Sequence, residues 1–141
     1  MRKSIASVSM APFFLVALLA CRSGKPEDQV REAFETCVAA VEAGDAAAAT
    51  EPLDAAFRGP EGMDKPAARL FLMGLLRQEK VGVAVIRDDV ALRGNEAFQE
   101  VDLILTGRGG GLLPQDASRR AFSLRWRKAG GDWKLVAIQE R

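Results

Sequence analysis

The chain has 141 residues, and its 20 basic and 19 acidic side chains nearly cancel. A hydrophobic content of 48% with 28% charged residues is typical of a folded chain and excludes an intrinsically disordered one. The near-neutral charge gives no reason to expect nucleic acid as a partner, and the lack of any His or Tyr removes two common acid–base side chains.

The first residues have the pattern of a secretory signal. Arg2 and Lys3 precede an apolar run from Met10 to Ala20, which ends in a small residue directly before Cys21. As a helix this run would be about 16 Å long, roughly half the thickness of the hydrocarbon core of a bilayer. We therefore expect residues 1–20 to be cleaved as a signal peptide rather than to remain in the membrane.

The residues at the expected cleavage site, Leu18-Leu19-Ala20-Cys21, resemble the lipobox of bacterial lipoproteins. This resemblance implies a diacylglyceryl group on the Cys21 thiol, with palmitate as a typical acyl chain, and an anchor in the cell envelope. Two acyl chains hold a protein stably, whereas one alone binds only marginally. Arg22 stands where Asp favours retention in the inner membrane of enterobacteria, so we expect the outer membrane, facing the periplasm.

Residues 21–25 form a short tether between the expected anchor and a single domain of residues 26–141. Five residue steps span at most about 18 Å, so the domain is expected to lie close to the bilayer. The length of this domain is enough for one hydrophobic core.

The domain is predicted to begin with two helices. The first lies between Pro26 and Gly44, where an initial Pro and two acidic side chains suit the positive end of a helix and the Gly suits its end. Asp45 caps a second, Ala-rich helix that reaches about Glu51. This helix is interrupted or restarted at Pro52, with Leu53 and Phe57 expected to face the core.

A third helix is predicted from about Asp64 to Gln78. Six apolar side chains between Leu70 and Leu76 make it apolar on most sides, so we expect it to be the most buried of the three. In the first helix, Cys37 shares a stripe with other apolar residues and is expected to pack as a small hydrophobe.

The second half of the chain changes to a period of two, which predicts strands at residues 81–86, 90–93, 96–106, 122–127 and 133–138. The strand at 81–86 is apolar on both sides and is therefore expected to be covered on both faces. In the last strand, Trp133, Leu135 and Ala137 are expected on one face, opposite Val136 and Ile138.

Gly109, Gly110 and Gly111 lie in a loop that runs to about residue 118. A phosphate-binding loop needs a helix directly behind it, and Leu112-Leu113-Pro114 does not start one. We therefore interpret these glycines as a flexible connection between two strands.

Three helices followed by an antiparallel meander predict an α+β fold in which the helices pack on one face of a curved sheet. The step Ala43-Gly44-Asp45 and the hairpin from Trp126 to Leu135 resemble the cone-shaped nuclear transport factor two-like superfamily, and most closely the lumazine-binding-like domains of bacterial lipoproteins. The resemblance implies a cavity between sheet and helices. In enzymes of this superfamily that cavity holds a carboxylate base, commonly with Tyr or His beside it.

Asp102 is the best catalytic candidate among the carboxylates, because a strand Asp turned into an apolar cavity can act as a base. The alternative is that it lies with Glu100 on the solvated face, which alternation with Val101 and Leu103 favours. We therefore assign no catalytic residue, and we keep Asp102 as the candidate of an enzymatic alternative.

Apolar side chains expected between the helices and the sheet are the candidates for ligand binding: Phe34, Val38, Leu75, Trp126 and Trp133. The two Trp residues could equally be core residues that hold the last hairpin against the helices. We predict no metal site, because there is no His and lipidation would leave one thiol, and we predict no cofactor.

Basic residues gather near the last hairpin: Arg119, Arg120, Arg125, Arg127, Lys128 and Lys134. In a nearly neutral chain such a group is usually a solvated face. The alternative is contact with anionic lipid headgroups, which the short tether would permit.

These observations predict a lipid-anchored protein of the cell envelope, held to the membrane through Cys21, with a non-catalytic domain that binds a small apolar ligand or a protein partner. One alternative is an enzyme of the polyketide-cyclase or isomerase type that uses a cavity carboxylate. The other is a structural adaptor in an envelope complex, for which we expect a filled core and an exposed apolar patch.

Overall fold

The structure, a computed structural model, describes residues 24–108 and 119–141. The predicted signal peptide, the lipid-attachment residue Cys21 and the glycines at 109–111 lie outside the described residues.

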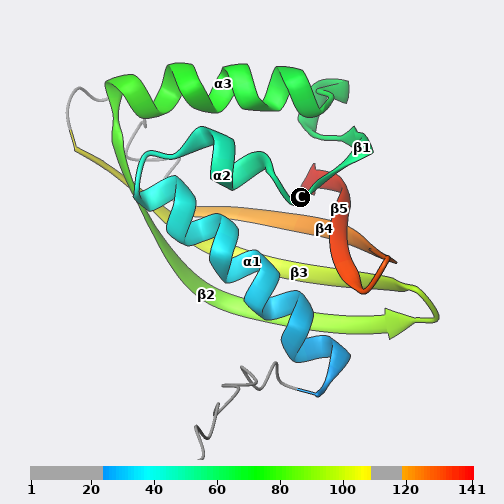
Figure 1. The fold of residues 1–141 in the computed structure, drawn as a ribbon. Coiled ribbons are helices and arrows are strands. Elements are labelled where there is room, and N and C mark those ends of the chain that lie inside the picture. The colour runs from blue at the N-terminus through cyan, green and yellow to red at the C-terminus, as the bar shows by residue number, and fades with distance from the viewer. Residues whose placement is uncertain (1–23, 109–118) are drawn as a thin grey trace, which may run out of the picture.

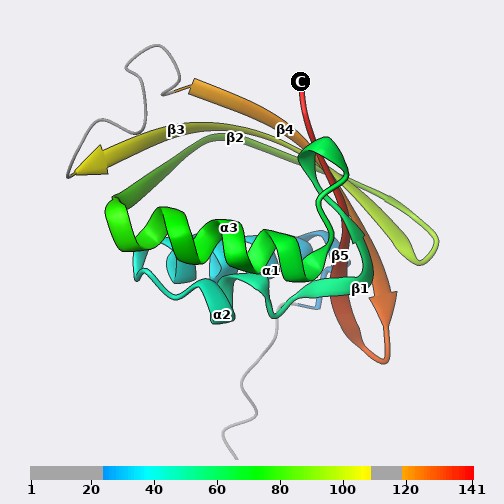
Figure 2. The same ribbon diagram turned by 90° about the horizontal axis from the view of Figure 1, so that it is seen from above.

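The domain is α+β, with three helices followed by a five-stranded sheet, as the sequence predicted. The helices are α1 (Pro26–Glu42), α2 (Ala46–Thr50) and α3 (Lys65–Gln78), with a short 3-10 turn, η1 (Pro60–Gly62). The strands are β1 (Leu53–Arg58), β2 (Lys80–Arg93), β3 (Glu96–Arg108), β4 (Arg119–Ala129) and β5 (Asp132–Glu140). The sheet has the order β1-β5-β4-β3-β2 and curves around the helices, which all lie on its concave face (Figures 1 and 2).

The predicted helix ends are confirmed by their capping residues. Gly44 adopts a φ of 74°, which lets the chain turn sharply after α1. The Asp45 carboxylate accepts a hydrogen bond of 3.0 Å from the Ala48 amide at the start of α2. Asp64 does the same for α3, accepting from the Ala67 amide at 2.9 Å.

The segment after Pro52 is a strand, so the prediction of an interrupted or restarted helix was wrong. Leu53 and Phe57 are buried, as expected, but they belong to β1. This strand pairs in parallel with β5, whereas all other neighbours in the sheet are antiparallel. Residues four apart lie on the same side of a helix and also of a strand, so Leu53 and Phe57 do not distinguish the two. The segment forms a strand because it pairs with β5, which is distant in sequence.

The third helix is the least buried part of the helix layer, which contradicts the prediction. Only Ala68 in α3 is fully buried, while Leu70 is 69% and Phe71 57% exposed. Figure 1 shows α3 at the edge of the layer, beyond α2, whereas α1 crosses the sheet. The helix therefore has a packing surface on one side alone.

The prediction of two short strands at 81–86 and 90–93, the first covered on both faces, was wrong because β2 is one strand with a β-bulge. The strand is continuous over Lys80–Arg93, and its pairing with β3 shifts between Val85 and Arg87. Val85 and Ile86 are 41% and 50% exposed, so this stretch is not covered on both faces. One extra residue reverses the alternation, and the residues that face the helices differ before and after it.

A second register shift, between Arg125 and Trp126 of β4, changes the faces of β5. Leu135 pairs with Trp126 and is buried, but Ala137 pairs with the exposed Arg125. Ile138 packs against the core cluster instead. The predicted faces of Ala137 and Ile138 were therefore wrong, because the bulge exchanges them.

Candidate functional site

The side chains predicted to bind ligand lie in or beside the hydrophobic core. Phe34, Trp126 and Trp133 are members of one buried cluster, and Val38 packs against it from α1. Leu75, on α3, is half-buried and is not part of that cluster. The structure thus brings four of the five together, in contact with core neighbours that include Val101 and Leu124.

Asp102 lies on the sheet face that points away from the helices. Its strand neighbours Val101 and Leu103 are buried, so alternation turns the carboxylate outward beside Glu100. There Arg141 places its Nη2 3.0 Å from Asp102 Oδ1 and its Nη1 3.7 Å from Glu100 Oε2. Asp102, the candidate of the enzymatic alternative, therefore lies with Glu100 on the outer face, as alternation favoured, and takes part there in an ion-pair network.

Asp88 is a carboxylate on the inner face of the sheet. The indole Nε1 of Trp126 donates to Gln99 Oε1 at 2.9 Å, and Gln99 Nε2 donates to Asp88 Oδ1 at 2.8 Å. Trp126 and Gln99 are both 0% exposed, and the chain of hydrogen bonds crosses β4, β3 and β2 in turn. Buried polar groups need such partners, so this chain fixes the three strands to one another.

Asp88 was not predicted as an inward residue, because the residue pattern does not reveal the bulge before Arg87. A usable signal was present in β3, where Gln99 interrupts the inward-facing apolar series of Ala97, Val101 and Leu103. A polar residue at an inward strand position indicates a buried hydrogen-bond partner on a neighbouring strand.

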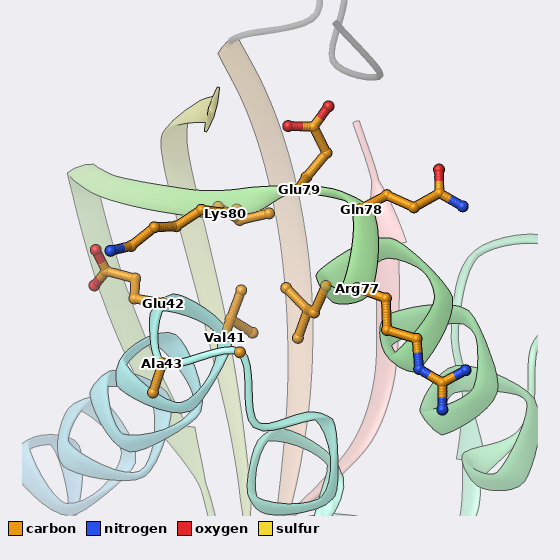
Figure 3. Close-up of a pocket in the computed structure, with 10 residues that line it drawn as sticks. Val41, Glu42, Ala43, Arg77, Gln78, Glu79 and Lys80 are labelled. Carbon is orange, nitrogen blue, oxygen red and sulfur yellow. The ribbon is translucent and has the colours of Figure 1, made fainter. Parts of the chain in front are cut away.

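An open pocket of about 330 Å³ lies where the ends of α1 and α3 meet the start of β2 (Figure 3). It forms because Gly44 turns the chain away from the end of α1, while Glu79, with φ −126° and ψ 137°, leads α3 directly into an extended strand. Its lining residues are Val41, Glu42, Ala43, Gly44, Leu76, Arg77, Gln78, Glu79, Lys80 and Val81. We call this the mouth pocket.

The mouth pocket combines an apolar part with charges of both signs. Val41, Leu76 and Val81 supply the apolar surface, and Val81 is only 4% exposed. Figure 3 shows that Glu42 and Lys80 extend toward one another, whereas Arg77 points away from them. Mixed polar groups around an apolar surface are typical of binding pockets, where they orient what enters.

A second pocket of about 380 Å³ adjoins the mouth pocket and shares Gly44, Leu76 and Arg77 with it. It follows the groove between α2 and α3, where Arg69 and Met73 line its other side. Together the two pockets make one open depression around the turn between α1 and α2. In the described part of the chain, no three His, Cys, Asp or Glu side chains are grouped so as to hold a metal ion.

Cys37 is a free, half-buried thiol on α1. Burial raises the pKa of Cys37 to about 11, because an apolar environment disfavours the thiolate. The neutral thiol is a poor nucleophile, so this residue behaves as the small packing group that its place in the apolar stripe predicted.

The basic residues of the last hairpin are largely engaged with partners. Arg127 pairs with Asp54 at 2.9 Å, Arg120 pairs with Glu140, and Lys128 lies over the Trp133 ring. The amide of Ala56 and the Arg127 guanidinium together lower the pKa of Asp54. These contacts engage part of the basic group, and contact with anionic lipid headgroups stays a prediction.

The comparisons with known proteins define the fold. An NTF2-like protein of Cytophaga hutchinsonii ATCC 33406 has a TM-score of 0.66 and 13% identity, over 82% of this chain and 97% of its own. An NTF2-like protein of Pseudomonas putida KT2440 has a TM-score of 0.66 and 14% identity, over 81% of this chain and 84% of its own. A nuclear transport factor 2 (NTF2-like) superfamily protein of Salmonella enterica serovar Typhimurium LT2 has a TM-score of 0.64 and 16% identity, over 82% of this chain and 89% of its own.

The chain therefore has the NTF2-like fold, which confirms the resemblance inferred from the hairpin and the Ala-Gly-Asp step at the level of fold. No family model matches the chain, and no curated protein matches it in sequence. Within residues 24–108 and 119–141, none of the helices has the length and apolar character needed to cross a bilayer.

Proposed function

We propose that this chain is a lipid-anchored protein of the cell envelope whose NTF2-like domain binds a small apolar ligand or an apolar side chain of a protein partner in the mouth pocket. The observation that carries the binding proposal is the mouth pocket itself. It joins an apolar surface from Val41, Leu76 and Val81 to the charged groups of Glu42 and Lys80. Its volume of about 330 Å³ is at the lower end of the range for small-molecule pockets.

The inner face of the sheet supports binding rather than catalysis. Trp126, Val101 and Phe57 are almost completely buried there as members of the hydrophobic core. Asp88 is held by Gln99, and Asp102 lies on the opposite face with Arg141. Each of these carboxylates therefore already has a hydrogen-bond donor from the protein.

The anchoring part of the proposal rests on the sequence. The run Leu18-Leu19-Ala20-Cys21 follows a basic start and an apolar segment, and residues 21–25 then leave only a short tether. Attachment through Cys21 would hold the domain in the envelope, with the outer membrane favoured by Arg22. The mouth pocket would then select partners that share this compartment.

Photo-crosslinking in intact cells tests the binding proposal. A benzophenone amino acid at Ala43, on the rim of the mouth pocket, should form an adduct whose mass distinguishes a small molecule from a protein. The same group at Ala129, exposed next to the β4–β5 turn, should not form that adduct. Adding Leu76→Lys should abolish the Ala43 adduct, and an adduct that persists in this variant would contradict binding in the mouth pocket.

Metabolic labelling tests the anchor. Radiolabelled palmitate should enter the chain and should be absent from a Cys21→Ser variant. Globomycin, which blocks the lipoprotein signal peptidase, should make the uncleaved form accumulate. If palmitate is never incorporated and globomycin leaves processing unchanged, the anchor has to be given up, whatever the crosslinking shows.

A further inference from the structure

The second pocket, which lies between α2 and α3 and which we call the groove pocket, is lined by side chains of two kinds. Its lining residues on α3 are Arg69, Met73, Leu76 and Arg77. At about 100° per residue these four fall within an arc of roughly 100°, so they share one side of the helix. On α2, the small side chains of Ala46 and Ala47 leave the opposite wall low. The groove pocket therefore has an apolar centre and a guanidinium group toward each end.

The two arginines of the groove pocket are exposed, and within residues 24–108 and 119–141 neither has a hydrogen-bond or ion-pair partner. In this they differ from arginines of the sheet. The exposed Arg127, for example, lies 2.9 Å from Asp54. A guanidinium group without a carboxylate beside it is available to an anion from outside.

The acidic residues around the two pockets lie apart from the Arg77 guanidinium or are already engaged. Asp45 lines the groove pocket, but its carboxylate accepts the hydrogen bond that caps α2. Figure 3 shows Glu42 extending toward Lys80, and the Glu79 carboxylate on the side opposite to the Arg77 guanidinium. The groove pocket, with two guanidinium groups and one carboxylate, is therefore positive on balance.

The groove pocket and the mouth pocket meet at Gly44, Leu76 and Arg77. A Cβ atom added at Gly44 would have nothing within 4 Å, so the junction is open. One elongated molecule can therefore occupy both pockets. Its apolar part would contact Val41 and Val81 in the mouth pocket, and its other end would lie beside Arg77.

We infer that the ligand is an amphipathic carboxylic acid of the fatty-acid class, with its apolar chain in the mouth pocket and its carboxylate bound by Arg77. The inference deepens the proposed function, on which it rests for binding in the mouth pocket. A guanidinium group pairs with a carboxylate through two parallel hydrogen bonds. A groove whose lining has one positive charge in excess suits a single carboxylate better than a doubly charged phosphate.

Arg69 has a weaker part in this arrangement. It precedes Arg77 by about 12 Å along the helix axis, so it adds positive potential without contacting the same carboxylate. Met73, between the two arginines, is half-buried and has a flexible side chain that adapts to apolar ligands.

Two probes that differ only in their polar group test this inference. Decanoate and decanol have the same apolar chain, and each is titrated by NMR into the Cys21→Ser chain at neutral pH, where decanoate is ionised. The amide signals of Gly44, Leu76 and Arg77 report on the junction of the pockets. The amide of Ala91, exposed on β2, is the reference that should not move.

Three variants separate the role of Arg77 in binding from its role in the helix. Arg77 lies in the last turn of α3, where a positive charge is favourable. Arg77→Gln removes the charge, and Arg77→Lys keeps it without the two parallel donors. The matched control is Arg93→Gln, an exposed arginine at the other end of β2. A merely structural role of Arg77 would alter the affinities for decanoate and decanol alike.

We expect decanoate to shift the junction amides and decanol to bind about tenfold more weakly, because decanol offers no charged partner. Arg77→Gln should weaken decanoate binding about tenfold and leave decanol binding unchanged, whereas Arg77→Lys should lose only part of the affinity. Arg69→Gln should weaken decanoate binding about twofold at low salt, since charges this far apart interact weakly in water. Arg93→Gln should change neither affinity.

Equal affinities for decanoate and decanol, or an equal loss of both in Arg77→Gln, would overturn the inference and leave binding in the mouth pocket intact. Tighter binding of decyltrimethylammonium than of decanoate would also overturn it, in favour of a cation beside Glu42 and Asp45. No shift of the junction amides with decanoate overturns it as well. The photo-adduct at Ala43 then decides the proposed function separately, because a protein adduct would assign the pocket to a protein partner and a missing adduct would remove both proposals.

Discussion

Helices α1 and α3 have similar apolar content but opposite surroundings. In α1, Val30 and Phe34 are 0% and 7% exposed against the sheet. In α3, Leu70 and Phe71 are mostly exposed, and the helix contacts α2 and β1 more than the rest of the sheet. The amount of apolar surface on a helix does not decide its burial. The position of the helix in the layer decides how much of it is buried. Apolar residues that remain exposed are available to contact other molecules.

The largest expected effect separates the two helices directly. Phe34→Ala should lower the free energy of unfolding by about 3–5 kcal/mol, because it leaves a cavity in the core. The matched change Phe71→Ala should alter it by no more than about 0.5 kcal/mol, since that ring is exposed. Urea denaturation measures both values. Equal losses would mean that Phe71 is buried in solution and would remove the contrast between the helices.

The same contrast applies to two glutamines of the sheet. Gln99 is 0% exposed, and its replacement by Leu leaves the Trp126 indole N–H and the Asp88 carboxylate without their partner. We expect a loss of about 2–3 kcal/mol from these unmade hydrogen bonds. The exposed Gln139 is the control, and Gln139→Leu should change stability by less than about 0.5 kcal/mol. If Gln99→Leu lowered the free energy of unfolding only slightly, the hydrogen bonds from Trp126 through Gln99 to Asp88 would contribute little to stability.

The burial of α1 also predicts a pH effect. The pKa of Cys37 is raised from about 9 to about 11, so the thiol is neutral in the folded and unfolded chain alike only well below pH 9. Between pH 9 and 11 the unfolded thiol ionises first, and stability should fall by about 1.4 kcal/mol per pH unit, up to about 2 kcal/mol. In Cys37→Ala this contribution should disappear. Identical pH slopes in the two proteins, measured by urea denaturation, would show that the thiol is solvated.

The smallest expected effects concern the helix starts. Asp64 caps α3, and Asp64→Ala should cost about 1 kcal/mol in thermal unfolding. The residue before α1 is Lys25, whose side chain makes no capping hydrogen bond. Lys25→Ser should therefore stabilise the domain, by roughly 0.5–1 kcal/mol. A loss of stability in Lys25→Ser would show that Lys25 has a role that its contacts do not explain.

The features that could be predicted from the sequence are those that depend on residues close together in the chain. The caps at Asp45 and Asp64 and the inward positions of Val101 and Leu103 in β3 are encoded within a few residues, and all are confirmed. The strand β1 was missed because its partner β5 lies far away in sequence. The burial of α3 was wrong because it depends on what packs beside the helix, which its own residues do not specify.

The candidate site was harder to predict for the same reason. The mouth pocket joins the end of α1 to the junction of α3 and β2, and none of its residues was predicted from the sequence to bind a ligand. Asp88 faces inward only because a bulge shifts β2 by one position. A single inserted residue in a strand exchanges its two faces, and residue alternation alone does not reveal it.

The parallel pairing of β1 with β5 sets an order of folding. Leu53 pairs with Leu135, so this edge of the sheet closes a loop of about 80 residues and forms slowly. While the chain is being synthesised, β1 has no strand to join until β5 has emerged. We expect amide protons of Leu53–Arg58 to gain protection last in pulsed hydrogen exchange. An edge that stays open until β5 has been synthesised leaves the sheet incomplete, which is the state that export in an unfolded form would require under the proposed function.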